Sequence, residues 1–169
     1  MDYTREELEE IIDKYGDMVY RLAFSYTKNK EDADDISQEV FIKFIQNAYK
    51  FKKIDDGYLK AWLIRVTINR CKDFLASYWN RNIIALSDDI TILMEEKSEV
   101  YEAVINLPEK YKIVIYLYYY EDYSVKEIAA ILKRSQGTVK WQLSKARQLL
   151  KEQLEKEGLY VSGHIQGSK

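Results

Sequence analysis

The side chains best suited to binding chemistry lie between residues 133 and 151. Lys or Arg stands at positions 133, 134, 140, 145, 147 and 151, and this stretch has no Asp or Glu, although the whole chain carries a formal net charge of -2. Such a local excess of cations is typical of a surface that meets phosphate groups. The stretch therefore predicts a nucleic-acid interface, and a solvated pair of surface helices remains the structural alternative.

Polar and aromatic groups around these cations complete the first candidate site. Its members are Ser135, Gln136, Thr138, Lys140, Trp141, Ser144, Lys145 and Arg147. In such a surface, cations contact phosphates and set the register, while contacts to base edges determine sequence preference.

Two short helices joined by a tight turn are predicted to position this site. One apolar helix face is formed by Val125, Ile128, Ala129 and Leu132, and a second by Val139, Leu143, Ala146 and Leu150. Ser135 is a plausible N-cap of the second helix. Two helices separated by about three to four residues form a helix-turn-helix.

A second candidate site combines a basic loop with a helix predicted from Tyr58 to Trp79. Its polar and basic members are Lys52, Lys53, Arg65, Asn69 and Lys72. Leu63, Val66, Thr67, Cys71, Phe74 and Tyr78 share the apolar face of this helix. Cations interleaved with Trp62 and Trp79 could hold unstacked bases, because rings stack on bases while Lys and Arg follow the backbone. Packing of the two tryptophans in the core is the alternative.

A third candidate site lies on the helix that follows Asn29-Lys30, where Asp32 can cap the helix or complement its positive end. Its buried side is predicted to hold Ala33, Ile36, Val40, Phe41, Phe44 and Ala48. Asp35, Gln38, Glu39 and Ile42 fall on roughly the opposite side. An isoleucine among acids and amides indicates a docking surface for another protein, although a solvated face with one apolar residue is the alternative.

Composition limits the fold and the chemistry. The 169 residues include only 6 Gly and 1 Pro, which predicts an almost wholly helical chain. The single cysteine cannot form an internal disulfide, the single histidine makes histidine catalysis improbable, and no metal-ligand spacing is present. We therefore expect no enzyme activity, metal or cofactor. The chain shows no signal peptide and no apolar run long enough to span a membrane, and we expect a reducing cytoplasmic location.

Charge and periodicity predict two small domains. Residues 51–81 and 111–157 are net basic, whereas 1–50 and 82–110 are net acidic. We predict a helical domain at 1–81, an acidic linker at 82–99, a second helical domain at 100–157 and a tail at 158–169. Within the second domain, Leu107-Pro108 marks a helix boundary, and an apolar helix containing Tyr111, Val114, Ile115, Leu117, Tyr118 and Tyr119 is expected to support the helix-turn-helix.

Three segments, in this order, resemble bacterial sigma factors of the extracytoplasmic-function group, the smallest members of the sigma-70 family. They are Asp32-Ala33-Asp34-Asp35 with Gln38-Glu39-Val40-Phe41, then Trp62-Leu63 through Asn69 to Asp73, then Leu107-Pro108 through Glu127-Ile128-Ala129 to Gly137-Thr138-Val139-Lys140 and Ala146-Arg147. In that family they are the polymerase-docking helix, the promoter-melting helix and the carboxy-terminal DNA-binding region. The similarity covers residues 8–150.

The resemblance implies an all-α, two-domain initiation factor that binds core RNA polymerase and promoter DNA. Residues 1–81 would dock on polymerase and melt the minus-ten element, and residues 100–157 would recognise the minus-thirty-five element. It also implies an anti-sigma partner, with no small-molecule substrate and no membrane insertion. Lys133 and Asp122 stand where glycine is usual, Lys112 where arginine is usual, and Trp141 where a small residue is more common.

The same residues are also compatible with two other classes of protein, a stand-alone regulator and a nuclease. A stand-alone helix-turn-helix regulator would not need the docking helix. A nuclease using Asp34 and Asp35 is disfavoured, because adjacent helical residues point about 100° apart and are poorly placed to share a metal.

Overall fold

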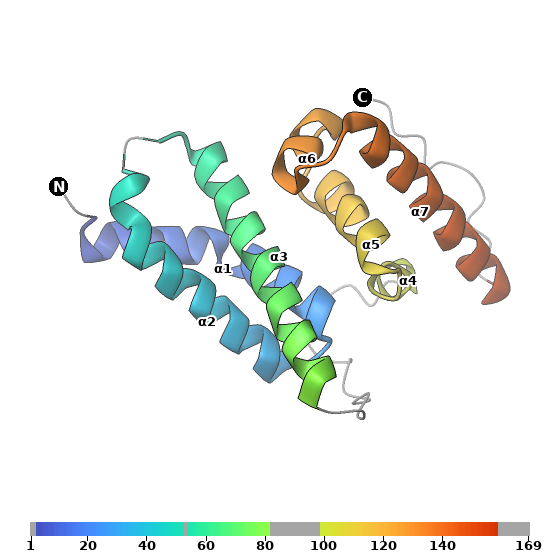
Figure 1. The fold of residues 1–169 in the computed structure, drawn as a ribbon, viewed down its shortest axis with the longest axis horizontal. Helices are drawn as coiled ribbons and strands as arrows, with labels where there is room; N and C mark the ends of the chain where they lie inside the picture. Colours follow the sequence, from blue (N-terminus) through green and yellow to red (C-terminus); the bar gives the residue numbers. More distant parts are fainter. Residues whose placement is uncertain (1–2, 53, 82–98, 159–169) are drawn as a thin grey trace. The chain divides into compact units, whose positions relative to one another are not determined.

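The computed structural model describes residues 3–52, 54–81 and 99–158, and these residues form helices and turns with no strand. The chain divides into two compact units, Met1–Leu93 and Met94–Lys169 (Figure 1). The expected all-α fold with two small helical domains is confirmed. The predicted 82–99 linker and the 159–169 part of the tail lie outside the described residues. No helix in the described part of the chain is long and apolar enough to cross a membrane.

The first unit is a bundle of three long helices. Its elements are α1 (Arg5–Thr27), α2 (Lys30–Asn47), the short 3-10 helix η1 (Ala48–Lys50) and α3 (Asp56–Arg81). Thr4 begins α1 with a capping box, in which its side chain accepts from the Glu7 N–H while the Glu7 carboxylate accepts from the Thr4 N–H. Of the two roles expected for Asp32, the structure supports the second: it lies in the first turn of α2, where its charge complements the positive end of the helix, and it is not the cap. Asn29 is the N-cap, and its side-chain oxygen accepts from the Asp32 N–H at 3.0 Å.

Each of these three helices packs against the other two. The predicted apolar side of α2 is buried at every position. The largest fully buried side chains among the described residues of the unit are Val19, Leu22, Ile36, Val40, Phe44, Leu63 and Ile64. The predicted face of α3 was too narrow, because Ile64 and Ile68 are also buried where α3 meets both neighbouring helices. Val66 and Phe74, assigned to the apolar face of α3, are only half-buried.

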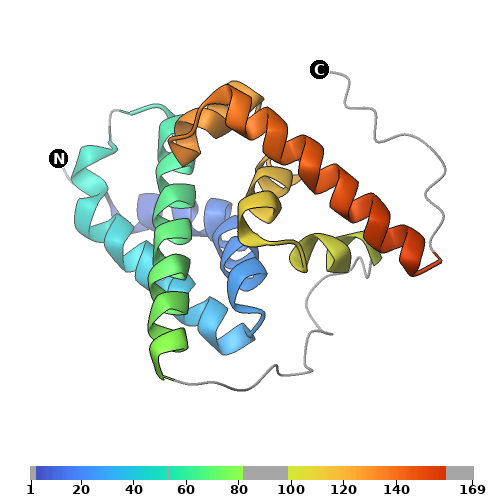
Figure 2. The same ribbon diagram turned by 45° about the vertical axis from the view of Figure 1, so that its right-hand side comes forward.

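The four α-helices described in the second unit include the two that form the predicted helix-turn-helix. They are α4 (Glu99–Ile105), α5 (Glu109–Ile115), which a π-helical turn η2 (Tyr116–Tyr120) extends, α6 (Val125–Leu132) and α7 (Gln136–Lys156). The long helix α7 contacts α4, α5 and α6, and Figure 2 shows α6 and α7 meeting at a tight turn. The helix-turn-helix predicted from the apolar periodicity is therefore present.

Burial in the second unit follows the predicted faces with three differences. Val139, Leu143, Ala146 and Leu150 are all buried. In α6, however, Ile131 is buried while Val125 and Leu132 are only half-buried. Tyr118 and Tyr119, both expected on the apolar support helix, lie within η2, where Tyr118 is half-buried and Tyr119 is exposed. Lys112, in contrast, is buried, and its ammonium donates to the Ile105 carbonyl at 3.3 Å. This bond satisfies the last carbonyl of α4.

Candidate nucleic-acid interface

The turn between α6 and α7 has a left-handed residue at its centre. Lys133, the C-cap of α6, has φ 53° and ψ 48°, and its N–H points back to the carbonyls of Ala129 and Ala130. A second left-handed residue, Asp122, has φ 56°. A non-glycine side chain is strained in this region, which explains why glycine suits both positions. Lys133 therefore places backbone strain at the turn that sets the direction of α7.

Ser135 begins α7 as predicted. Its Oγ accepts from the Thr138 N–H at 3.0 Å and lies 2.8 Å from the Thr138 hydroxyl. Both side chains are exposed, but part of their hydrogen-bonding capacity is used to cap the helix. Ser135 and Thr138 therefore fix the start of α7 in addition to being candidate DNA contacts.

A contact that the sequence did not predict braces this turn. Arg134 donates from Nη1 to the Gln142 side-chain oxygen at 2.9 Å, and Gln142 is buried in α7. The bond links the last residues of the turn to the second turn of the helix, so it restrains the angle at which α7 leaves the turn. Gln142 lies three residues after Val139 and next to Leu143, and this helical spacing was the sequence signal that could have predicted its burial.

The burial of one side of α7 sets the direction of its outward face. Because Val139, Leu143 and Ala146 are buried, residues half a helical turn away point to solvent. Gln136, Lys140, Trp141 and Ser144 are exposed, and Lys145 and Arg147 are half-buried. The structure thus brings the eight predicted residues of the first candidate site together on one helix and its N-cap.

Arg147 differs from the other cations of this surface. Its Nε donates to the Tyr119 hydroxyl at 2.8 Å, and its guanidinium lies 5.6 Å from the centre of the Tyr118 ring. These contacts tie α7 to the π-helical turn η2. Arg147 was predicted only as a DNA contact, and the structure adds a packing role within the unit.

The predicted docking face of α2 is exposed as expected. Asp35, Gln38 and Glu39 are exposed, and Ile42 keeps 54% of its surface accessible. Sequence reasoning missed two further exposed apolar residues, Ile45 at 46% and Tyr49 at 64% accessible surface. Their spacing from Ile42, at i+3 and i+7, was the signal that could have found them.

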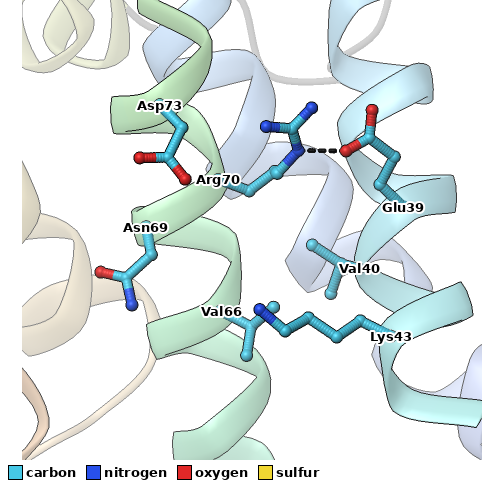
Figure 3. Close-up of a pocket in the computed structure, with 7 residues that line it drawn as sticks. All are labelled: Glu39, Val40, Lys43, Val66, Asn69, Arg70 and Asp73. Carbon is cyan, nitrogen blue, oxygen red and sulfur yellow. Dashed lines mark hydrogen bonds and ion pairs between the residues drawn. The ribbon is translucent and has the colours of Figure 1, made fainter. Parts of the chain in front are cut away.

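Glu39 also contacts the helix that carries the second candidate site. Arg70 of α3 donates from Nε to the Glu39 carboxylate, and this bond holds the pKa of Glu39 below its ordinary value (Figure 3). The pair borders an open pocket of about 320 Å³ between α2 and α3, which Glu39, Val40, Lys43, Val66, Asn69, Arg70 and Asp73 line. Asn69 is exposed and points away from Glu39 in Figure 3. Residues predicted for two different partners thus share one pocket.

The remaining members of the second candidate site are spread along the loop and α3. Lys52 forms an ion pair with Glu7 of α1 at 3.4 Å, and the Arg65 guanidinium lies 5.9 Å from the centre of the Tyr58 ring. Lys72 is exposed. Lys53 and the side chain of Trp79 lie outside the described residues. Trp62 is half-buried, with its ring centre 4.8 Å from that of Phe51, which agrees with the packing alternative.

Comparison with known proteins connects these surfaces to a family. Residues 11–81 match the model of sigma-70 region 2, and residues 97–150 match a model of sigma-70 region 4. The chain is 35% identical to the RNA polymerase sigma factor SigV of Bacillus subtilis, over 83% of this chain and 86% of that protein. It is 29% identical to the ECF RNA polymerase sigma factor SigW of the same organism, over 89% and 90% of the two chains.

Solved structures show the same fold. The sigma factor RpoE from Bartonella quintana, in complex with the anti-sigma factor NepR, superimposes with a TM-score of 0.69 at 20% identity, covering 87% of this chain and 96% of that one. CnrH, in complex with the cytosolic domain of CnrY, gives a TM-score of 0.66 at 19% identity and 91% coverage of both chains.

The two matched regions and the curated relatives define the class of protein: the chain belongs to the sigma-70 family. Within that family it is a member of the extracytoplasmic-function group.

Proposed function

We propose that this protein binds core RNA polymerase and directs it to promoters, acting in the cytoplasm as a transcription initiation factor. The observation that carries the proposal is the combination, in one chain, of the exposed face of α2 with the cationic outward face of α7. A stand-alone regulator needs only the second of these surfaces. The proposed activity is binding without a chemical step.

The second unit is the proposed recognition module for the minus-thirty-five element. α7 would enter the major groove, where Lys140 and Lys145 reach phosphates and Gln136, Trp141 and Ser144 reach base edges. Ser135 and Thr138 would hold the N-terminus of α7 against the sugar-phosphate backbone of the DNA. The contacts from Arg134 and Arg147 to their own unit keep this helix in a fixed orientation.

The first unit is the proposed module for the minus-ten element. Lys52, Lys53, Arg65, Asn69 and Lys72 would hold bases after they leave the stack. Extruding a base costs a few kcal/mol, so stacking and backbone contacts are needed to offset that cost. Asp35, Gln38, Glu39 and Ile42 would bind core polymerase, which then holds both modules at their elements.

We propose domain limits that match the separate roles of the two units. We assign 1–81 to the polymerase and minus-ten module, 82–99 to an acidic linker, 100–157 to the minus-thirty-five module and 158–169 to a tail. An anti-sigma factor that covers these faces is a further proposed partner. The similar structure of RpoE in complex with the anti-sigma factor NepR supports it. Sequence similarity to the family also supports the absence of catalysis.

Run-off transcription with purified core polymerase tests the function. We expect the protein to confer promoter-specific transcripts on core polymerase that core alone does not make. Tight promoter-specific binding by the lone protein, with no affinity for core polymerase, would favour the stand-alone regulator instead.

A further inference from the structure

An exposed tryptophan stands in the middle of the outward face of α7. Trp141 keeps 57% of its surface accessible, whereas Trp62 in the first unit is half-buried against Phe51. Exposing so large an apolar side chain forgoes the free energy of its burial, so packing within the fold does not explain its position. A residue of this kind on a candidate interface calls for an apolar partner.

The indole is supported rather than loose. Its ring centre lies 6.0 Å from that of Tyr111, at an interplanar angle of 52°, and Tyr111 is buried at the base of α5. Lys110 in turn lies over the Tyr111 ring, with its ammonium 4.8 Å from the ring centre. A ring supported on one side loses less conformational freedom on binding, which favours its use as an anchor.

The position of Trp141 on the helix fits contact with base edges. It lies in the second turn of α7, and the N-terminal turns of the second helix of a helix-turn-helix face the bases. The buried Val139 and Leu143 lie on the opposite side of the helix, and the exposed Lys140 and Ser144 flank the indole. This cationic and polar surround is suited to DNA and not to an apolar protein groove.

The major groove offers one apolar group on its base edges, the C5-methyl of thymine. We propose that Trp141 determines specificity by packing against a thymine methyl in the upstream promoter element. The inference rests on the proposed function and adds to it the chemical identity of one base that α7 reads. Thr138 is the other candidate member with an apolar group, a single methyl beside the Ser135 cap, so Trp141 offers the larger apolar surface for this contact.

Deoxyuridine substitution tests the contact without changing the protein. The holoenzyme, assembled with core polymerase, first selects its promoter from a randomised duplex library. Each thymine of the selected upstream element is then replaced by deoxyuridine, which removes only the methyl group. We expect one substitution to weaken holoenzyme binding by about threefold to fivefold, the loss typical of one apolar carbon contact.

Protein variants identify the residue that senses the methyl group. In Trp141→Ala, binding should weaken and the same deoxyuridine substitution should have no further effect. Lys140→Ala should weaken binding while keeping the methyl dependence, because it alters charge. Gln148→Ala, about 10 Å further along the same face, should also keep it.

Three results would overturn the inference. They are a selected element without thymine, binding by the wild-type holoenzyme that no deoxyuridine substitution changes, and a Trp141→Ala variant that keeps the full methyl dependence. Promoter-specific run-off transcription by the wild-type holoenzyme separates these outcomes from failure of the proposed function, because initiation can succeed while the methyl dependence is absent.

Discussion

Arg70 of α3 pairs with Glu39 of α2, so a charged contact joins the proposed polymerase-docking helix to the proposed melting helix. Both side chains remain partly exposed, at 46% for Glu39 and 39% for Arg70, and solvent therefore screens the attraction. The pair contributes little to stability. It does place the charged carboxylate of Glu39, on the proposed docking surface, next to the proposed melting helix. Its effect should be measurable as a dependence of stability on pH.

The first prediction is that coupling between Glu39 and Arg70 disappears in acid. The bond with Arg70 lowers the pKa of Glu39 in the folded protein from its ordinary value of 4.5. The ion pair therefore stabilises the fold at pH values above the unfolded pKa, and this stabilisation is lost as the pH falls through the folded pKa. We expect a coupling below about 1 kcal/mol at pH 7 and close to zero at pH 3. Urea unfolding of Glu39→Gln, Arg70→Gln and the double variant at both pH values measures it. A coupling that persists at pH 3 would contradict this assignment.

The second prediction concerns docking on polymerase. Replacing Gln38 and Ile42 together by Ala should abolish promoter-specific transcription, because losing an anchor at such an interface costs about 2 kcal/mol or more. Helicity and thermal melting should change little, since both side chains are exposed. Pull-down of core polymerase followed by run-off transcription is the measurement. Glu10→Ala with Asp13→Ala, exposed on α1, is the control and should retain binding.

The third prediction concerns strand opening. Asn69→Ala should impair formation of the open complex more than initial duplex binding, because its proposed partner exists only after bases leave the stack. Permanganate reactivity of melted thymines reports this step. Ser77→Ala changes another exposed polar residue of α3 and should leave the reactivity unchanged. Normal reactivity in Asn69→Ala would remove Asn69 from the proposed role.

The fourth prediction separates two cations of α7, Lys140 and Arg147. Lys140→Ala should weaken promoter binding by the holoenzyme and reduce the salt slope by up to about one unit, as expected when one phosphate contact is lost. Arg147→Ala should also lower the stability of the second unit, because it removes the bond to Tyr119. Salt titrations and thermal melting distinguish the effects. Equal melting temperatures for both variants would contradict the packing role of Arg147.

The fifth prediction uses the same substitution at two sites. Lys133→Gly should stabilise the second unit by up to about 1 kcal/mol, because glycine adopts the left-handed conformation without strain. Lys151→Gly, in the interior of α7, should destabilise it by about 1 kcal/mol. Thermal unfolding of both variants gives the comparison. Destabilisation by Lys133→Gly would show that interactions of the lysine side chain stabilise the unit by more than the left-handed backbone conformation destabilises it.

Local patterns in the sequence were sufficient to predict the helices and most of their buried faces. Val139, Leu143, Ala146 and Leu150 are buried as predicted, and Ser135 caps α7. These features depend on the helical repeat and on bonds between residues three or four apart, which a sequence displays directly. The same repeat placed Ile42 and Trp141 on exposed faces.

Only the tertiary structure decided which groups from different helices meet. The Arg70–Glu39 contact joins residues 31 positions apart, and the Arg147–Tyr119 bond joins residues 28 apart. Ile64 and Ile68 are buried because α3 packs against two helices at once, which widens its buried face. Periodicity reports the direction of a side chain around its own helix axis, whereas its neighbour depends on how the helices cross.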